Sequence, residues 1–404
     1  MTTTQTTPVI LAAKRTPIGK FVGGLTKVPS PVLGSYAISG LFAEQPKLKA
    51  EAEAGRLDEV IMGCVLQAGL GQNPARQAAL KAGIPDTISA VTVNKVCGSG
   101  LQAVMQAAQS IKAGDGSLVI AGGFESMTRA PYMAALRDGA GAPKFGPTQF
   151  EDHMQYDGLR CAFECWAMGN AADYLAKKHD VSRAEQDRWA ARSHQLAAQA
   201  TKEGWFKNEI VALTGEQCMD KKSPGVAADE GIRPDTTLES LAKLRAVFDK
   251  DGTVTAGNAS QISDGAAALA VASLHKAEQL GIKPVAKIIA YHTSGVAPKD
   301  IFSAPSLAVP AVLAKAGLKV SDIDLFEINE AFAAQLLQNI KAAGIPEAKV
   351  NIAGGGVALG HPIGASGARI LTTLIHQLHR TGGKRGVAGL CLGGGNAVAM
   401  VIEV

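Results

Sequence analysis

The chain has 404 residues and a formal net charge of +4, and 47% of its residues are hydrophobic while 19% are charged. This length and balance predict a globular protein of two or three structural units, and the small charge without a lysine–arginine cluster argues against a nucleic-acid-binding protein. No apolar run of about 18 residues predicts a membrane span and no signal peptide is recognisable, so we expect a cytoplasmic protein whose six cysteines are thiols.

Residues 1–127 alternate short apolar strands with alanine-rich helices. We predict strands at Pro8–Ala13, Glu59–Gly63, Val91–Asn94 and Leu118–Ala121, and helices at Asn73–Ala82 and Gly100–Ala113. This alternation is typical of an α/β sheet with helices on both faces.

Residues 128–255 have a different character, because they are more charged, more aromatic and more helical. The stretch Arg183–Glu203 has apolar residues at helical spacing among many polar ones, which predicts a surface helix. We interpret residues 128–255 as an insertion into the α/β pattern.

The α/β pattern then resumes and continues to the C-terminus. We predict strands at Val285–Ala290, Leu325–Asn329, Val350–Ala353, Val387–Cys391 and Ala397–Val404, and helices at Leu307–Ala316, Ala331–Ala343 and Ala365–His379.

This C-terminal segment also repeats sequence features of residues 1–127. Residues 97–100 (Cys-Gly-Ser-Gly) and 364–367 (Gly-Ala-Ser-Gly) each open a predicted helix, and each half later reaches a strand that ends in glycines. We interpret this as a duplicated α/β unit whose two helix N-termini face one site. One half would comprise residues 1–127 and 256–282, and the other residues 283–404. Chance similarity between glycine–serine helix starts is the alternative.

Cys97 is the first candidate for chemistry. It lies where a predicted strand ends and a helix begins, so unpaired backbone N–H groups and the positive end of the helix dipole would face its sulfur. Both favour the thiolate, which is the reactive form of cysteine. The alternative is a cysteine that fills a small buried space.

Three further residues have both a chemical and a structural interpretation. His361 stands in a glycine-rich loop before a proline, and it is either a base for Cys97 or a loop cap. Cys391 precedes Leu-Gly-Gly-Gly at a strand end, and its thiol is either an acid/base group or part of the core. The backbone N–H groups of the glycines could form an oxyanion hole. Asn329 precedes a predicted helix and is either part of the site or an N-cap.

Together these segments resemble the thiolase family from residue 15 to the C-terminus. The motifs are Arg-Thr-Pro-Ile-Gly at 15–19, Gly-Gln-Asn-Pro-Ala-Arg-Gln at 71–77, the Cys97 loop, Thr-Ala-Gly-Asn-Ala-Ser at 255–260, Asn-Glu-Ala-Phe at 329–332, Gly-His-Pro at 360–362 and Cys-Leu-Gly-Gly-Gly at 391–395. The resemblance implies the duplicated five-layered thiolase fold, with two α/β halves, mixed sheets and an inserted loop domain that binds CoA.

The resemblance also implies an acetyl-CoA acetyltransferase or 3-ketoacyl-CoA thiolase of fatty acid metabolism, including β-oxidation. Such an enzyme makes or cleaves a 3-oxoacyl-CoA by ping-pong Claisen chemistry. By position, Cys97 would carry the acyl group, His361 would activate it, and Cys391 would exchange a proton with the acetyl methyl group. Asn329 would hold a water that forms one oxyanion hole with His361. The backbone N–H groups of Cys97 and Gly393 would form the other.

For CoA, the resemblance places Arg233 near the phosphates, Ser240 and Leu244 near the adenine, and Ser260 and Met168 along the pantetheine. Taken alone, Arg233 is equally an ordinary surface arginine. CoA and acyl-CoA would be substrates, and no tightly bound cofactor is implied. No metal site is predicted either, because the pair formed by the cysteines at 161 and 165 lacks a matching second pair.

One segment departs from the family pattern. Many short-chain thiolases have His-Met-Gly where residues 167–169 are Ala-Met-Gly, and an acidic–amide pair where this chain has Asp173 and Tyr174. The sequence therefore leaves the acyl and CoA preference open.

Other functions fit the sequence less well. A ketosynthase acting on carrier-bound acyl groups would have histidine at position 329. A dinucleotide-binding oxidoreductase would have a Gly-x-Gly-x-x-Gly motif followed by an acidic residue at the expected spacing. A non-catalytic CoA-binding protein would have lost a catalytic residue, and none is lost here. The resemblance places residues 72–77 near a subunit contact, so we expect a homodimer or homotetramer.

Overall fold

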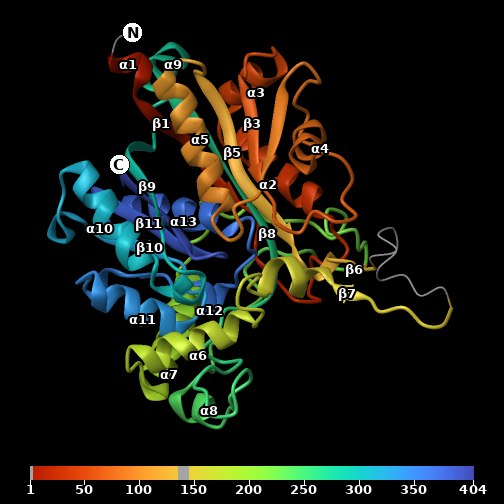
Figure 1. The fold of residues 1–404 in the computed structure, drawn as a ribbon. Coiled ribbons are helices and arrows are strands. Elements are labelled where there is room, and N and C mark those ends of the chain that lie inside the picture. Colours follow the sequence, from red (N-terminus) through yellow and green to blue (C-terminus); the bar gives the residue numbers. More distant parts are fainter. Residues whose placement is uncertain (1–2, 135–144) are drawn as a thin grey trace.

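The computed structural model describes residues 3–134 and 145–404. Its main feature is a ten-stranded mixed sheet in which nine strands follow the order β10-β11-β12-β9-β1-β8-β5-β3-β4, while β2 pairs with β8 (Figure 1). The strands are β1 (Pro8–Arg15), β2 (Gly19–Lys20), β3 (Glu59–Gly63), β4 (Ser89–Val93), β5 (Leu118–Ser126), β8 (Ser263–Ser273), β9 (Ala286–Gly295), β10 (Leu325–Ile328), β11 (Arg385–Leu392) and β12 (Asn396–Glu403). A separate pair is formed by β6 (Tyr132–Met133) and β7 (Glu151–Asp152).

The two halves of this sheet share one pattern, in which the last strand is inserted next to the first, although the first half has more strands. In the first half the order is β1-β8-β5-β3-β4, so the last strand, β8, lies between β1 and β5 and is antiparallel to both. In the second half the order is β9-β12-β11-β10, and β12 is likewise antiparallel to β9 and β11. The predicted duplication of an α/β unit is therefore confirmed as a fold, whereas the exact domain boundaries stay a prediction.

The predicted strand Val350–Ala353 is wrong. Only Val350 remains of it, in a single parallel bridge to Phe326. The next residue, Asn351, has a φ of +46°, and its side chain replaces the missing ladder: Oδ1 accepts from the Ile328 N–H at 2.9 Å and Nδ2 donates to the Ile328 carbonyl at 2.8 Å. The side chain thus pairs with β10 as a strand would.

The helices are α1 (Thr3–Thr6), α2 (Ser30–Glu44), α3 (Pro46–Glu53), α4 (Pro74–Lys81), α5 (Ser99–Ala113), α6 (Met168–Lys178), α7 (Arg183–Lys202), α8 (Leu238–Ala242), α9 (Leu274–Leu280), α10 (Pro305–Ala316), α11 (Ala333–Ala342), α12 (Gly356–Leu359) and α13 (Ser366–Thr381). Short 3-10 turns occur at Met127–Arg129, Pro298–Ser303, Val320–Asp322 and Glu347–Lys349, and a π-helical turn at Met154–Leu159. Among these described helices, none is long and apolar enough to cross a membrane.

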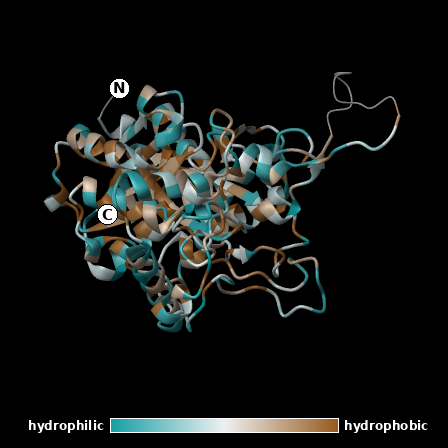
Figure 2. Ribbon diagram, turned by 60° about the horizontal axis from the view of Figure 1, so that its bottom comes forward, coloured by the Kyte–Doolittle hydropathy of each residue, from teal (hydrophilic) through white to brown (hydrophobic). Residues whose placement is uncertain are grey.

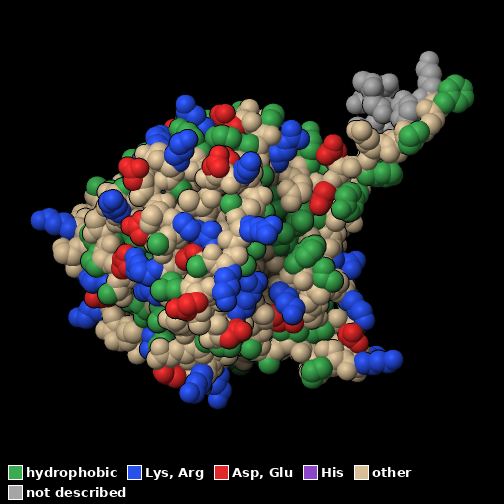
Figure 3. Space-filling model, turned by 90° about the horizontal axis from the view of Figure 1, so that it is seen from below, with side chains coloured by type: hydrophobic (Ala, Val, Ile, Leu, Met, Phe, Trp, Pro, Cys, Tyr) green, Lys and Arg blue, Asp and Glu red, His purple; other side chains and the backbone are tan. Residues whose placement is uncertain are grey.

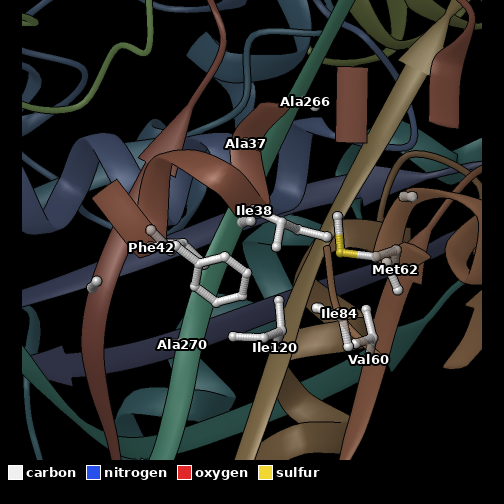
Figure 4. Close-up of a cluster of buried hydrophobic side chains, with 14 of the residues drawn as sticks. Ala37, Ile38, Phe42, Val60, Met62, Ile84, Ile120, Ala266 and Ala270 are labelled. Carbon is white, nitrogen blue, oxygen red and sulfur yellow. The ribbon is translucent and has the colours of Figure 1, made fainter. Parts of the chain in front are cut away.

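The elements stack in five layers, in the order helix, sheet, helix, sheet, helix. The two halves of the ten-stranded sheet form the two sheet layers. On one outer face α2 and α4 cover the first half of the sheet, where Ile38 and Phe42 pack over Val60, Met62 and Ile120 (Figure 4). On the other, α10 packs on β9, β12 and β11, and α11 packs beside it. Between the halves, α5 and α13 pack against each other and share one apolar cluster with strands of both halves. Figure 2 shows the hydrophobic residues gathered along the central strands.

The two central helices meet closely at their first turns. A Cβ atom on Gly367 would lie 2.4 Å from the backbone nitrogen of Leu101, and one on Gly100 would lie 2.9 Å from that of Ala368. Only glycine permits this backbone-to-backbone approach. The N-termini of α5 and α13 therefore lie side by side, as the repeated Gly-Ser pattern predicted.

The insertion is tied to the body of the fold by buried charges. The guanidinium of Arg15, at the end of β1, contacts Glu209 Oε1 at 2.6 Å and Asp229 Oδ1 at 2.7 Å. Glu330, after β10, accepts from Trp189 Nε1 at 2.9 Å and Ser193 Oγ at 2.7 Å on α7. Removing one member of such a pair would leave an uncompensated buried charge, at a cost of about 3–5 kcal/mol. These contacts fix the insertion against both halves.

Candidate active site

A cavity of about 880 Å³ opens where the two halves meet the insertion. Its walls include the predicted residues Cys97, His361, Cys391, Gly393, Arg233, Ser260 and Met168. Figure 3 shows hydrophobic side chains gathered on one part of this face, and charges of both signs scattered over the rest of it. The structure therefore brings most of the predicted residues into one chamber.

Cys97 sits in a strained turn between β4 and α5. Val96, the residue before it, has a φ of +48°, in the left-handed region that costs a β-branched residue about 1–3 kcal/mol. The Ser99 hydroxyl holds this turn, because Oγ accepts from the Lys95 N–H at 2.8 Å and donates to the Val96 carbonyl at 2.6 Å. The strain aims the Cys97 side chain into the cavity, and such strain is typical of functional sites.

Opposing effects act on the pKa of the Cys97 thiol. Burial raises the pKa of its thiol to about 12, although the backbone N–H groups of Gly393 and of Cys97 itself lower it. The helix starts two residues later, at Ser99, so its free N–H groups do not dominate. Burial thus opposes the thiolate that a helix start would favour, and the reactive form of this sulfur stays a prediction.

His361 lies at the inner wall of the cavity, in the loop between α12 and α13. Its Nδ1 is 2.6 Å from Ser366 Oγ, and the Asn329 amide nitrogen is 3.4 Å from both ring nitrogens. Burial and the positive charge of Arg369 lower the pKa of His361 to about 3. The imidazole is therefore neutral at physiological pH, and one of its ring nitrogens carries a lone pair.

Cys391 and Gly393 stand at the turn that joins β11 to β12. Cys391 is buried, and burial together with the nearby Cys97 raises the pKa of its thiol well above the ordinary value. Gly394 and Gly395 follow with φ values of +83° and +84°, a conformation that requires glycine. This turn directs the Gly393 N–H toward the sulfur of Cys97.

Asn329 lies behind His361, at the end of β10 and outside the lining of the cavity as far as the described residues show. Its backbone N–H donates to the Gly389 carbonyl at 3.0 Å, continuing the sheet. The side chain is fully buried, yet its Oδ1 has no hydrogen-bond partner among the described residues. A buried polar atom of this kind commonly binds an ordered water.

The predicted CoA contacts divide into two groups. Arg233, Ser260 and Met168 line the cavity, whereas Ser240 and Leu244 are not among the described lining residues. Ser240 is exposed on α8, and Leu244 packs against a small cluster on α7. The role of each residue toward CoA stays a prediction. Within the described parts of the chain, no group of three or more His, Cys, Asp or Glu side chains is placed to hold a metal ion.

Comparison with known proteins decides the family. Residues 8–275 match the family model "Thiolase, N-terminal domain", and residues 282–404 match "Thiolase, C-terminal domain". The chain belongs to the thiolase family.

Individual relatives agree along nearly the whole chain. It is 50% identical to the acetyl-CoA acetyltransferase of Chromobacterium violaceum and 48% identical to that of Pseudomonas aeruginosa, in each case over 98% of both chains. It is also 46% identical to the probable acetyl-CoA acyltransferase of Staphylococcus aureus strain COL, over 99% of both. The crystal structure of the Bacillus anthracis acetyl-CoA acetyltransferase matches with a TM-score of 0.91 at 41% identity, covering 98% of both chains. This thiolase is therefore an enzyme with the predicted fold.

The structure also shows site residues of this thiolase that the sequence did not single out. Ser366 contacts the His361 ring, and Gln261 supports the same loop: its carbonyl accepts from the His361 N–H at 3.1 Å, while its Nε2 donates to the carbonyls of Gly231 and Val357. Ser366 stands five residues after His361 at a helix start. That spacing was the available signal, but it served only to recognise the repeat.

The segment that departs from the family pattern lies at the cavity. Ala167 lines the cavity, whereas Trp166 does not belong to its described lining. The indole of Trp166 instead packs near Tyr174, with ring centroids 5.8 Å apart, and against the apolar cluster of the second half. The tryptophan therefore leaves the space beside Ala167 free.

Proposed function

We propose that this thiolase transfers an acyl group between CoA thioesters through a covalent thioester on Cys97, and so makes or cleaves a 3-oxoacyl-CoA. The observation that supports the proposal is the content of one cavity: a thiol on a strained turn beside the Gly393 N–H, a neutral imidazole at His361 and a second thiol at Cys391. A nucleophile, a base, an oxyanion donor and a separate proton carrier are the parts that this chemistry needs.

In the first half-reaction, His361 takes the proton of the Cys97 thiol as the sulfur attacks the thioester carbonyl of acetyl-CoA. The oxyanion that forms accepts hydrogen bonds from the backbone N–H groups of Cys97 and Gly393. When the intermediate collapses, the carbon–sulfur bond to CoA breaks, and the departing CoA thiolate takes the proton of Cys391. The products are free CoA, acetylated Cys97, an imidazolium at His361 and a thiolate at Cys391.

In the second half-reaction, the Cys391 thiolate removes a methyl proton from a second acetyl-CoA. The enolate oxygen is stabilised by His361 and by a water on Asn329, and its carbon attacks the Cys97 thioester. The carbon–carbon bond forms, the bond to Cys97 breaks, and Cys97 takes its proton back from His361. All three groups return to their starting states, and cleavage follows the same steps in reverse.

This scheme uses CoA and acyl-CoA as substrates, and none of its steps calls for a metal ion or a tightly bound cofactor. The pantetheine arm would pass Met168 and Ser260, and the phosphates would lie near Arg233, all of which line the cavity. Both half-reactions would then use the same chamber in turn, so free CoA would leave before the second acetyl-CoA binds, as in a ping-pong mechanism.

The test is the site of acetylation. The enzyme is incubated with acetyl-CoA, quenched in acid and digested, and the peptide masses are measured by mass spectrometry. Acetyl should appear on Cys97 and disappear in Cys97→Ser, while Cys165→Ser, which removes another cysteine of the cavity wall, should keep it. Acetyl found only on Cys391 would contradict the proposal.

A further inference from the structure

The contacts of the His361 ring are unequal. On the Nδ1 side, Ser366 Oγ lies at 2.6 Å, and the same hydroxyl lies 2.9 Å from the Pro362 carbonyl oxygen. The other neighbour of the ring is the Asn329 amide nitrogen, which lies 3.4 Å from Nε2 and equally far from Nδ1. An atom at equal distance from both nitrogens cannot lie along the lone pair of either, so this contact is not a directed hydrogen bond.

The Ser366 hydroxyl has one proton, and a carbonyl oxygen only accepts. If the hydroxyl donates to the Pro362 carbonyl, its oxygen is free to accept from Nδ1–H, and the group makes two hydrogen bonds. If the hydroxyl instead donates to Nδ1, the contact with the Pro362 carbonyl is lost and one bond remains. The first arrangement is favoured by one hydrogen bond, worth about 0.5–1.5 kcal/mol.

We propose that Ser366 is a positioning residue that holds neutral His361 as the tautomer with its proton on Nδ1, so that Nε2 presents a lone pair to the cavity. This inference rests on the proposed function, since it explains how the imidazole is ready to take the Cys97 proton. It also explains the second half-reaction: once Nε2 carries that proton, Nδ1–H keeps the same partner, and the ring donates from Nε2 without turning.

The wild-type enzyme tests this directly. With histidine labelled with nitrogen-15, the nitrogen shifts of His361 report which ring nitrogen carries the proton, and His361→Asn assigns the signals among the eight histidines of the chain. We expect a protonated Nδ1 and an unprotonated Nε2 at neutral pH. A proton on Nε2 would overturn the inference, whatever the kinetics of any variant. This measurement does not depend on whether Cys97 is the acylated residue.

A variant pair then tests the effect on rate. Ser366→Ala should lower kcat about 10- to 100-fold with little change in KM, because base catalysis loses its favoured tautomer, and its nitrogen shifts should move toward a proton on Nε2. Thr372→Val is the matched control, since Thr372 Oγ1 donates to the Ala368 carbonyl at 2.9 Å on the same helix without touching the ring. We expect Thr372→Val to keep kcat within about twofold of wild type.

Two results would overturn the inference here as well: unchanged kcat and nitrogen shifts in Ser366→Ala, or an equal loss of kcat in both variants. Either could occur while Cys97 is still acetylated in the wild type, in which case the proposed function stands and only the role of Ser366 fails. Conversely, absence of acetyl on Cys97 with the proton found on Nδ1 would reject the proposed function alone.

Discussion

At the scale of single residues, the site rests with both of its thiols protonated and its imidazole neutral. Burial raises the pKa of Cys97 to about 12 and lowers that of His361 to about 3. The order of these two pKa values disfavours a thiolate–imidazolium pair in the resting enzyme. The thiolate must form as His361 takes the proton during the attack.

The pH dependence of alkylation checks this protonation state. In His361→Asn, the rate at which iodoacetamide alkylates Cys97 should rise about tenfold per pH unit from about pH 6 to about pH 9, because the thiolate fraction grows in that proportion below a raised pKa. The wild type should react faster at the low end, where His361 supplies the base. A plateau near neutrality in the variant would show that Cys97 has a depressed pKa instead. Cys97→Ser measures the background.

Cys391→Ala should separate the two half-reactions. The CoA thiolate is a weak base that water can protonate, so acetylation of Cys97 should slow less than about tenfold. No other group replaces Cys391 in removing the methyl proton, so condensation should fall on the order of 1,000-fold. Rapid-quench acetylation and steady-state condensation measure the two steps. Cys218→Ala, which removes a buried cysteine that is not among the described lining residues of the cavity, is the control. Equal loss of both steps in Cys391→Ala would contradict the assignment.

The sequence was enough to predict that the candidate residues share one site, but not the environment of each. The cavity brings together Cys97, His361 and Cys391, which the sequence had placed in three separate motifs. The Gly393 N–H beside the Cys97 sulfur and the Asn329 amide beside the His361 ring are contacts between residues far apart in the chain, which no local pattern expresses. The contact between Ser366 and His361 joins residues only five apart, but no pattern in the sequence indicated a role for it.

At the scale of elements, local patterns succeeded where they agreed with packing. Strand β3 was predicted with its observed bounds, Glu59–Gly63, and α5 differs by one residue at its start. Strand β8 was missed because Ser263–Ser273 is rich in alanine, which has low strand propensity, and its extended form comes from pairing with β1 and β5 on both sides. Tertiary pairing, rather than sequence preference, makes this strand.

The start of α6 provides a prediction about chain length. With Trp166 turned away, the space beside Ala167 is open, and each further methylene buried there is worth about 0.8 kcal/mol. We expect the enzyme to cleave a six-carbon 3-oxoacyl-CoA with a kcat/KM within about tenfold of that for acetoacetyl-CoA. Ala167→His should narrow this range because the imidazole fills the space.

Ala167→Ser is the control for the length experiment, since it adds a polar group without the bulk of a ring. It should keep the wild-type ratio of the two specificity constants. Strict four-carbon specificity in the wild type, or an unchanged ratio in Ala167→His, would show that the start of α6 does not set the acyl pocket.

At the scale of the whole molecule, the two ends of the main sheet differ. Strand β10 is fully buried at one end, and the Val350 bridge covers it. Strand β4 ends the other side, and within the described chain its outer edge has no strand partner. Val91 on this strand is 39% exposed, and Leu80 on the neighbouring α4 is 45% exposed. Unpaired edge strands with exposed apolar residues invite pairing with another chain unless charge or cover prevents it.

We therefore propose that β4 and α4 form the contact of a homodimer, alone or within a homotetramer. This agrees with the expectation that residues 72–77 lie near a subunit contact, because α4 begins at Pro74 and packs against β4. A twofold axis through this edge would pair each β4 with its copy and bury both apolar patches at once.

Light scattering at micromolar concentration should give twice or four times the chain mass. Val91→Lys places a charge on the edge and should shift the equilibrium toward smaller species, whereas Leu307→Lys, which changes an exposed leucine on α10, should not. A monomeric wild type, or equal dissociation by both variants, would contradict this interface.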